Sequence, residues 1–404
     1  MAGWFFLSFS LLGALLVLNA ARASRRPNLL VISWLAAFLT TDLAPFHILL
    51  AAGVTAAFAW GGALETVQGQ AALLIVVVSS AWLAVLWLPN RHAAGRATAV
   101  SAELELDPVD SVSRKLLLTP FKRVVSGVAV DRNIEFSRPA GRSLALDIYR
   151  PELNSDRRPA LLYLHGGGWI VGDKSNQGLP LCNHMAQLGW VCANANYRLS
   201  PAATWPDHVI DAKAAIAWLR EHADAFGIDP GFIAIAGGSA GAHIAAMAAL
   251  TAGDPVLQPG FESADTSIQA AAPFYGVYDL TNRLGAHHPD FLTKMLGPYV
   301  IKAFPDTELH RFSAASPRDH VDKVSQPWLV LQGDRDSLTP AFEARDFTAG
   351  LDVASSHPVG YLDLPGAQHA FDIYYSPRAI AAVEAAARFL TTSHRRAAEA
   401  QQDS

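Results

Sequence analysis

The chain has 404 residues, a formal net charge of −5 at pH 7 and two cysteines. This length allows one large α/β domain and an additional region. The slightly negative net charge gives no electrostatic support for nucleic-acid binding. The two cysteines, Cys182 and Cys192, form neither a disulfide framework nor a zinc pattern. Hydrophobic residues make up 51% of the chain and charged residues only 17%, which indicates segments that enter a membrane.

Three apolar segments lie within residues 1–90, at 4–20, 29–60 and 71–88. A bilayer core needs about 20 apolar residues per helix, so the pattern predicts three transmembrane helices, or four if the middle segment divides. That middle segment is too long for one straight span and marginal for two. Asp42 and Pro45 within it predict a kink or a tight break between two short helices. A cleavable signal peptide is disfavoured because no positive residue precedes the first apolar run.

Arginines mark the ends of this apolar region. Arg22, Arg25 and Arg26 follow the first segment, and Arg91 and Arg96 follow the last, whereas the loop GGALETVQG carries no Lys or Arg. The positive-inside rule places both clusters in the cytoplasm. Three spans then put the N-terminus outside and the large C-terminal domain in the cytoplasm, and four spans would make that domain exoplasmic. We favour three, in a multi-pass protein whose partner is the lipid bilayer.

A polar segment, residues 91–123, follows and is expected to be a linker. Lys115, Lys122 and Arg123 flank the apolar run LLLTPF. This part of the linker either lies on the membrane surface or forms a solvated helix.

Residues 124–393 alternate short β-type runs with helical stretches. GVAVDRNIEF and SLALDIYRP predict a hairpin, and PALLYL, VCANANYRL, FIAIAGG and three later runs predict further strands. Helical periodicity falls between them, which predicts an α/β fold with a mostly parallel sheet and helices on both faces. Residues 394–404 are expected to be a polar tail.

Polar or glycine-rich motifs follow four of the predicted strands. They are HGGGW at 165–169, GGSAG at 237–241, the pair Asp334 and Asp336, and His369. Because the carboxyl ends of parallel strands meet at one edge of a sheet, these motifs are expected to lie together.

The order Ser239, then an aspartate, then His369 is the order of a serine nucleophile on an α/β-hydrolase sheet. A serine hydroxyl needs a base to remove its proton, an imidazole can serve as that base, and an aspartate holds the imidazole in one tautomer. Asp334 and Asp336 both remain candidates from this order alone.

Backbone N–H groups near Ser239 are expected to stabilise a developing oxyanion. Gly167 and Gly168 are the favoured donors from the glycine run, with Gly166 as a further candidate. Ala240 adds the N–H at the start of the next helix. The glycines that flank Ser239 relieve crowding at a sharp strand-to-helix turn.

The motifs HGGGW, GGSAG, NYRLSP, GDRDSLTP and GAQHAFD, spread over residues 125–392, resemble the esterase/lipase family related to hormone-sensitive lipase. The resemblance is greatest to actinobacterial carboxylesterases with N-terminal membrane helices. It implies an α/β-hydrolase fold and a carboxylesterase with Ser239 as nucleophile, Asp336 as acid and His369 as base. Two positions depart from the family pattern: Gly238 stands where Asp or Glu is commoner, and Ser337 stands where Pro is frequent.

Several other residues have competing interpretations. Trp169 is a candidate substrate-binding residue and Tyr197 a possible neighbour in the acyl pocket, although core packing explains both equally well. His165 and His243 are expected to be structural, and His287 and His288 to be loop residues rather than metal ligands. Residues 281–316 are too long for a plain connection, so they predict a lid or cap with an apolar face formed by Phe291, Leu292, Met295 and Leu296.

The sequence therefore predicts a membrane-anchored serine carboxylesterase or lipase that forms an acyl-enzyme and needs no cofactor or metal. One alternative is an arylformamidase or another amide-cleaving serine hydrolase on the same fold. Another is a non-catalytic membrane binding protein, which the complete set of motifs disfavours. A transporter is disfavoured because Asp42 is the only acidic residue within the apolar segments. Acyl-chain length, natural ester and oligomeric state are not indicated.

Overall fold

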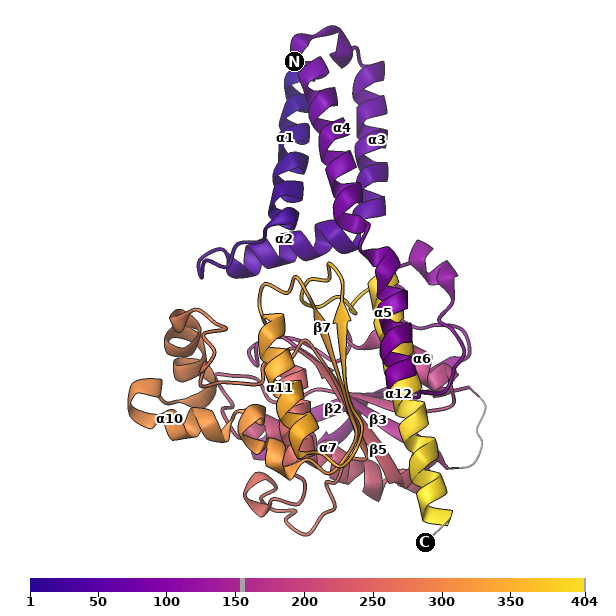
Figure 1. Cartoon of the computed structure of the whole chain (residues 1–404), viewed down its shortest axis with the longest axis vertical. Coiled ribbons are helices and arrows are strands. Elements are labelled where there is room, and N and C mark those ends of the chain that lie inside the picture. The colour runs from indigo at the N-terminus through magenta and orange to yellow at the C-terminus, as the bar shows by residue number, and fades with distance from the viewer. Residues whose placement is uncertain (153–156, 403–404) are drawn as a thin grey trace.

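The computed structural model describes residues 1–152 and 157–402. Within this part of the chain, a bundle of apolar helices at the N-terminus stands on an α/β domain built around one sheet (Figure 1).

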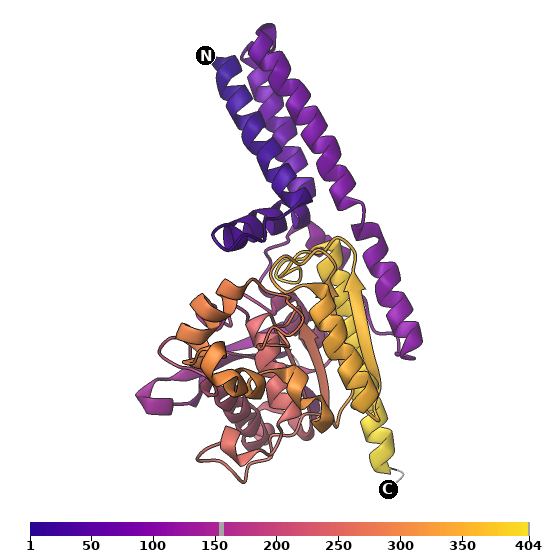
Figure 2. The same cartoon turned by 60° about the vertical axis from the view of Figure 1, so that its left-hand side comes forward.

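The bundle contains four helices, α1 (Ala2–Ala21), α2 (Leu30–Asp42), α3 (Ala44–Trp60) and α4 (Val67–Trp87). Helices α1, α3 and α4 lie side by side, and α2 crosses below them at the end nearest the α/β domain (Figures 1 and 2). The chain bends by 82° between α2 and α3. The predicted break near Asp42 and Pro45 is therefore confirmed, and Pro45 lies in the first turn of α3, where its missing N–H costs no helical hydrogen bond.

Among the described residues, two helical stretches are long and apolar enough to cross a membrane, Ala2–Ala21 and Val67–Glu103. The bent pair α2 and α3 provides a third when it is counted as one span. The N-terminus lies at the end of the bundle far from the α/β domain (Figure 1). By length and composition, the described residues therefore allow two crossings, or three if the bent pair counts as one.

The sheet has the strand order β1-β2-β4-β3-β5-β6-β7-β8. The first two pairings in this order are antiparallel, and the remaining five are parallel. The strands are β1 (Val128–Ser137), β2 (Leu144–Pro151), β3 (Arg158–Leu164), β4 (Val191–Ala195), β5 (Ile228–Gly238), β6 (Ala270–Phe274), β7 (Trp328–Gly333) and β8 (Val359–Leu364). The predicted hairpin and the mostly parallel sheet are thus both confirmed.

Helices cover both faces of the sheet, as expected. One face packs against α7 (Asp207–Glu221), α9 (Ala240–Leu250) and α11 (Ala341–Ala354). The other packs against α5 (Asn90–Glu103), α6 (Leu179–Gln187) and α12 (Pro377–Gln402). Cys182 and Cys192 are buried free thiols on this second face.

Two segments expected to be irregular are helical. Helix α5 occupies the start of the predicted linker and packs along α12, with Ala93, Ala97 and Val100 buried at helical spacing. Residues 394–402 of the predicted tail form the last turns of α12, while residues 403–404 lie outside the described residues. Both segments are rich in alanine, the residue with the highest helix propensity.

The insertion at 281–316 forms a π-helical segment, η5 (Phe291–Ile301), followed by α10 (Pro305–Ala314). Leu292 and Leu296 are buried, whereas Phe291 and Met295 remain partly exposed. Two residues of the predicted apolar face therefore pack on the core, and the other two are partly accessible to solvent.

Candidate active site

Ser239 lies on the sharp turn between β5 and α9. Its backbone angles are φ 56° and ψ −120°, a strained combination for a residue with a side chain, which costs roughly 1–3 kcal/mol. The turn also requires glycine at its flanks. A Cβ on Gly241 would lie 2.1 Å from the carbonyl oxygen of Leu164, and one on Gly237 would lie 2.6 Å from the carbonyl carbon of Gly241. Ser239 remains partly exposed although its neighbours are buried, so a substrate can reach it.

His369 and Asp336 meet at the ends of β8 and β7. The distance from His369 Nδ1 to Asp336 Oδ2 is 2.7 Å, and both side chains are buried. The backbone N–H groups of Leu338 and Thr339 each donate to Asp336 Oδ1 at 2.8 Å. A carboxylate held in this way accepts the proton of Nδ1, which leaves Nε2 of the imidazole as the basic nitrogen.

Asp334 has a different position. It is exposed, and its Oδ1 accepts the N–H of Gly366 at 2.6 Å. Of the two aspartates that the sequence left open, the structure brings Asp336 to the imidazole and uses Asp334 to cap a loop.

The strand registers place the Ser239 turn and the His369 loop at one edge of the sheet, because Gly238 pairs with Phe274 and Gly333 pairs with Leu364 at the carboxyl ends of parallel strands. Tyr275 contacts both parts: its ring lies 4.7 Å from that of His369, and its hydroxyl lies 2.7 Å from where a Cβ of Gly238 would be. Within residues 1–152 and 157–402, the Ser239 hydroxyl has no hydrogen-bond partner. Two of the three predicted catalytic residues are thus in direct contact, and the third lies at the same edge.

The glycine run lies against Ser239. A Cβ on Gly166 would be 3.0 Å from Cβ of Ser239, and the Gly166 N–H already donates to Gln177 Oε1 at 2.7 Å. Among the described residues, the N–H groups of Gly167 and Gly168 have no acceptor, and Ala240 begins α9, where N–H groups lack helical partners. The N–H groups without an acceptor are therefore those of Gly167 and Gly168, the two glycines that the sequence favoured, whereas the N–H of Gly166 already has an acceptor.

The conformation of Gly167 explains why glycine is needed there. Its φ is +127°, and a Cβ would come within 1.9 Å of the Val171 carbonyl oxygen. Gly168 has φ +60°, and the methyl carbon of Met295 lies 3.0 Å from its Cβ position. The insertion at 281–316 therefore contacts the glycine run directly.

Trp169 is 1% exposed and packs in the core behind the glycine run. Its indole N–H donates to His243 Nδ1 at 3.2 Å, and His243 Nε2 lies 2.8 Å from the Ala315 carbonyl oxygen. Burial lowers the pKa of His243 to about 4, so its ring is neutral and structural. A contact between Trp169 and substrate stays a prediction.

The other histidines that the sequence raised also have local partners. His165 Nδ1 lies 2.8 Å from the Gly166 carbonyl oxygen, and its ring stacks on Tyr197 at 4.5 Å, which agrees with a structural role. His287 Nε2 lies 2.9 Å from Glu343 Oε2, a buried pair that sequence reasoning missed.

A cluster behind the sheet edge that carries Ser239 and His369 was also missed. The Tyr275 and Tyr163 hydroxyls both donate to the buried carboxylate of Asp372, and burial raises the pKa of that carboxyl. Tyr275 fills the space beside Gly238 where the resembling family commonly has an acidic side chain. The sequence signal was the position of Asp372, three residues after His369 in GAQHAFD.

Sequence reasoning also missed that α2 reaches this edge. The Trp34 indole N–H donates to the His369 carbonyl oxygen at 3.0 Å, and the two rings lie edge-to-face with centroids 5.8 Å apart. Arg25 donates to the Asp336 carbonyl oxygen at 3.3 Å. Asp42 and Arg378, both buried, form an ion pair of 3.0 Å between α2 and the start of α12.

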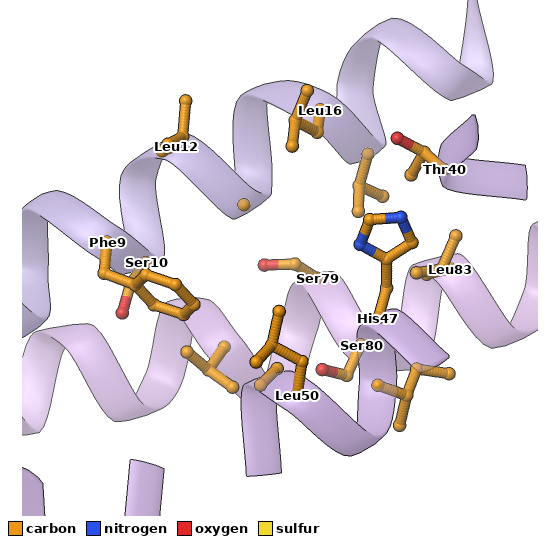
Figure 3. Close-up of a pocket in the computed structure, with 15 residues that line it drawn as sticks. Phe9, Ser10, Leu12, Leu16, Thr40, His47, Leu50, Ser79, Ser80 and Leu83 are labelled. Carbon is orange, nitrogen blue, oxygen red and sulfur yellow. The ribbon is translucent and has the colours of Figure 1, made fainter. Parts of the chain in front are cut away.

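A separate cavity lies within the helix bundle. It has a volume of about 200 Å³ and is bounded by α1, α3 and α4, with Thr40 of α2 at its edge (Figure 3). Its lining is mainly apolar, with His47, Ser79 and Ser80 among the polar groups. Every residue that lines it lies between positions 9 and 83, so it is distinct from the site around Ser239.

Comparison with known proteins gives related sequences and a related fold. The chain is 47% identical over 254 residues to the esterase LipQ of Mycobacterium tuberculosis, covering 62% of this chain and 60% of that protein. It is 46% identical over 270 residues to the probable carboxylic ester hydrolase LipM of the same organism, covering 66% of this chain and 62% of that protein. The chain thus spans about three fifths of the length of these relatives.

A solved structure of the esterase Est2 from the planctomycete Thermogutta terrifontis superposes with a TM-score of 0.55 at 28% identity, covering 66% of this chain and 92% of that one. Residues 146–351, half of the chain, match the BD-FAE family. The expected α/β-hydrolase fold is therefore confirmed, and the chain belongs to the BD-FAE family.

Proposed function

We propose that the chain is a membrane-anchored serine carboxylesterase that cleaves carboxylic esters by the triad Ser239, Asp336 and His369. The observation that carries this proposal is the 2.7 Å contact between Asp336 and His369 at the sheet edge where Ser239 occupies a strained turn. Relatives named as esterases and a carboxylic ester hydrolase support the ester as substrate class.

The reaction would proceed in two steps. Ser239 Oγ attacks the ester carbonyl carbon while its proton passes to Nε2 of His369. The resulting imidazolium, stabilised by Asp336, then protonates the leaving alcohol as the bond from the carbonyl carbon to the alcohol oxygen breaks. Water, deprotonated by the same imidazole, attacks the acyl-enzyme and releases the acid.

The oxyanion would accept hydrogen bonds from Gly167, Gly168 and Ala240. Their N–H groups have no acceptor in the described structure, and α9 adds the positive end of its dipole. Removal of one such donor typically slows an acyl transfer by about 10²–10³-fold.

The test is Ser239→Ala in the full chain, assayed with a short-chain nitrophenyl ester and with the matching anilide. We expect loss of essentially all esterase activity and no labelling by a fluorophosphonate probe, with an unchanged unfolding temperature. Ser143→Ala, at an exposed turn, is the matched control and should retain both signals. Full esterase activity in Ser239→Ala would overturn the proposal, and faster cleavage of the anilide than of the ester by the unmutated chain would favour an amide-cleaving hydrolase.

The membrane topology is part of the proposal. We propose that α1, α3 and α4 cross the bilayer and that the catalytic domain, residues 124–393, lies in the cytoplasm. The N-terminus and this domain lie at opposite ends of the bundle, and the arginines near residues 22–26 and 91–96 lie on the domain side (Figure 1). A cysteine introduced at Gly62 should react with an impermeant thiol reagent added outside intact cells, whereas one introduced at Val353 should not.

A further inference from the structure

Helix α2 separates the bundle from the catalytic edge. It runs across the lower ends of α1, α3 and α4, after an 82° bend, rather than along them (Figures 1 and 2). If the three upright helices cross a bilayer, a helix in this orientation lies in the plane of the membrane–water interface. This is the orientation of interfacial helices, which keep one apolar side in the lipid.

One side of α2 belongs to the catalytic centre. Trp34 and Phe38, one helical turn apart, both face the α/β domain: Trp34 contacts His369, and Phe38 stacks on Tyr374 at 5.7 Å. Arg25, just before α2, contacts Asp336. His369, the predicted base, is therefore in direct contact with a side chain of α2.

Another side of α2 is apolar and exposed. Val31 is 60% exposed and Ile32 71%, and Leu35 continues the same surface one turn later. A contiguous exposed apolar surface on a helix needs an apolar partner. Arg22 and Arg26, exposed beside it, suit the anionic headgroups of a cytoplasmic leaflet.

A second apolar surface lies at the same level. Leu118 is 79% exposed and Phe121 59%, and the ring of Phe121 packs on Tyr374 at 4.7 Å, on the residue that also stacks with Phe38. Lys122 and Arg123 follow directly and are exposed. The run LLLTPF and α2 therefore both contact Tyr374, five residues after His369, and both carry exposed apolar side chains.

We propose that α2 and the 118–121 run rest in the membrane interface around the entrance to the catalytic centre, so that the substrate is an ester dissolved in the membrane. This inference rests on the proposed function and adds its substrate class. The ester bonds of membrane lipids lie near headgroup level, which is the level of α2. A lipid-like ester then reaches Ser239 by a short displacement at the interface, while its acyl chain stays in apolar surroundings.

The position of α2 is tested without any activity measurement. Ile32→Cys in the full chain is labelled with a polarity-sensitive dye in nanodiscs that contain phosphatidylglycerol, and Val353→Cys, 89% exposed on α11, is the matched control. Cys182 and Cys192 are buried and should not react. We expect blue-shifted emission and quenching by spin-labelled lipid only for the dye at position 32. Equal emission and no quenching at both positions would overturn the inference.

The substrate class is tested with a long-chain umbelliferyl ester dissolved in nanodiscs and a short-chain nitrophenyl ester in water. At constant bulk concentration, cleavage of the long-chain ester should follow its mole fraction in the disc. The double variant Ile32→Glu/Leu35→Glu should lose about tenfold on the membrane-dissolved ester and little on the soluble one, because the new charges oppose insertion of α2. Val353→Glu is the control and should retain both rates.

A rate that depends only on the bulk ester concentration, or a double variant that keeps its activity on the membrane-dissolved ester, would overturn the inference. Neither result affects the proposed function, which the soluble ester and Ser239→Ala test separately. An inactive Ser239 site would instead abolish both rates in the unmutated chain.

Discussion

The N-terminal bundle and the α/β domain use the same kinds of side chain in opposite ways. In the domain, Trp169 and Trp328 are 1% and 0% exposed, and the sheet is covered on both faces. In the bundle, Trp60 is 94% exposed and Leu49 70%. Large apolar side chains are therefore packed in the interior of the domain and are exposed on the surface of the bundle. Helix α2 belongs to both, since one of its sides contacts His369 and another is exposed.

The largest expected effect lies wholly within the domain. Asp336→Asn keeps the shape of the side chain but favours the wrong tautomer of His369, and it should lower kcat by about 10⁴-fold. Asp334→Asn, on the exposed loop two residues earlier, should stay within about threefold of the unmutated chain. Steady-state hydrolysis of a short-chain ester measures both. Equal losses in the two variants would contradict the assignment of Asp336.

The next largest effect is expected when the ion pair between the bundle and the domain is removed. Asp42→Asn leaves Arg378, 0% exposed, as a buried charge without its partner, and it should destabilise the folded chain by about 3–5 kcal/mol. Arg395→Gln removes an exposed pair with Asp107 and should cost less than about 1 kcal/mol. Thermal unfolding of the full chain in detergent compares them. Similar unfolding temperatures would mean that the bundle and the domain are only loosely joined.

A smaller effect is expected from the buried histidines of the domain, whose pKa values are lowered. Burial lowers the pKa of His243 to about 4 and that of His208 to about 3, against about 6.5 in an unfolded chain. As the pH falls, both histidines become protonated in the unfolded chain before they do so in the folded chain. Their neutral burial therefore contributes fully to the free energy of unfolding above about pH 6.5, and this contribution is lost as the pH falls toward 4. At pH 5 each histidine should contribute about 1–2 kcal/mol less than at neutral pH. The unfolding temperature should therefore fall on acidification, and His243→Gln should flatten that fall.

The smallest expected effect lies at the contact between the regions. Trp34→Phe keeps an aromatic ring but removes the N–H donor to the His369 carbonyl, so it should lower kcat by about 5-fold with little change in KM. Trp60→Phe, at the far end of the bundle, is the matched control. A change in KM alone would show that Trp34 acts on binding and does not position the imidazole.

Much of the domain could be predicted from the sequence because its signals are local. Two strand runs lead directly into HGGGW and GGSAG, His369 follows a third strand after a short loop, and the parallel order of the strands brings these ends together. The free N–H groups of Gly167 and Gly168 follow from the same pattern. The choice of Asp336 needed either the family resemblance or the structure, since Asp334 follows the same strand.

The orientation of α2 could not be predicted in this way. The break at Asp42 could be predicted, but the partner that holds Asp42 against the domain, Arg378, lies 336 positions later in the chain. Likewise, nothing near Gly238 in the sequence indicates that Tyr275 fills the space beside it. Both features depend on contacts between distant segments, which no local periodicity records.

The ion pair between Asp42 and Arg378 has a consequence for biosynthesis. On the proposed topology the ribosome delivers the apolar helices first, and Asp42 reaches the membrane long before Arg378 has been translated. The bend beside Asp42 keeps this carboxylate near the interface, where water can solvate it in the meantime. The pair then closes only when α12 docks, so the last helix made completes the attachment of α2 to the α/β domain.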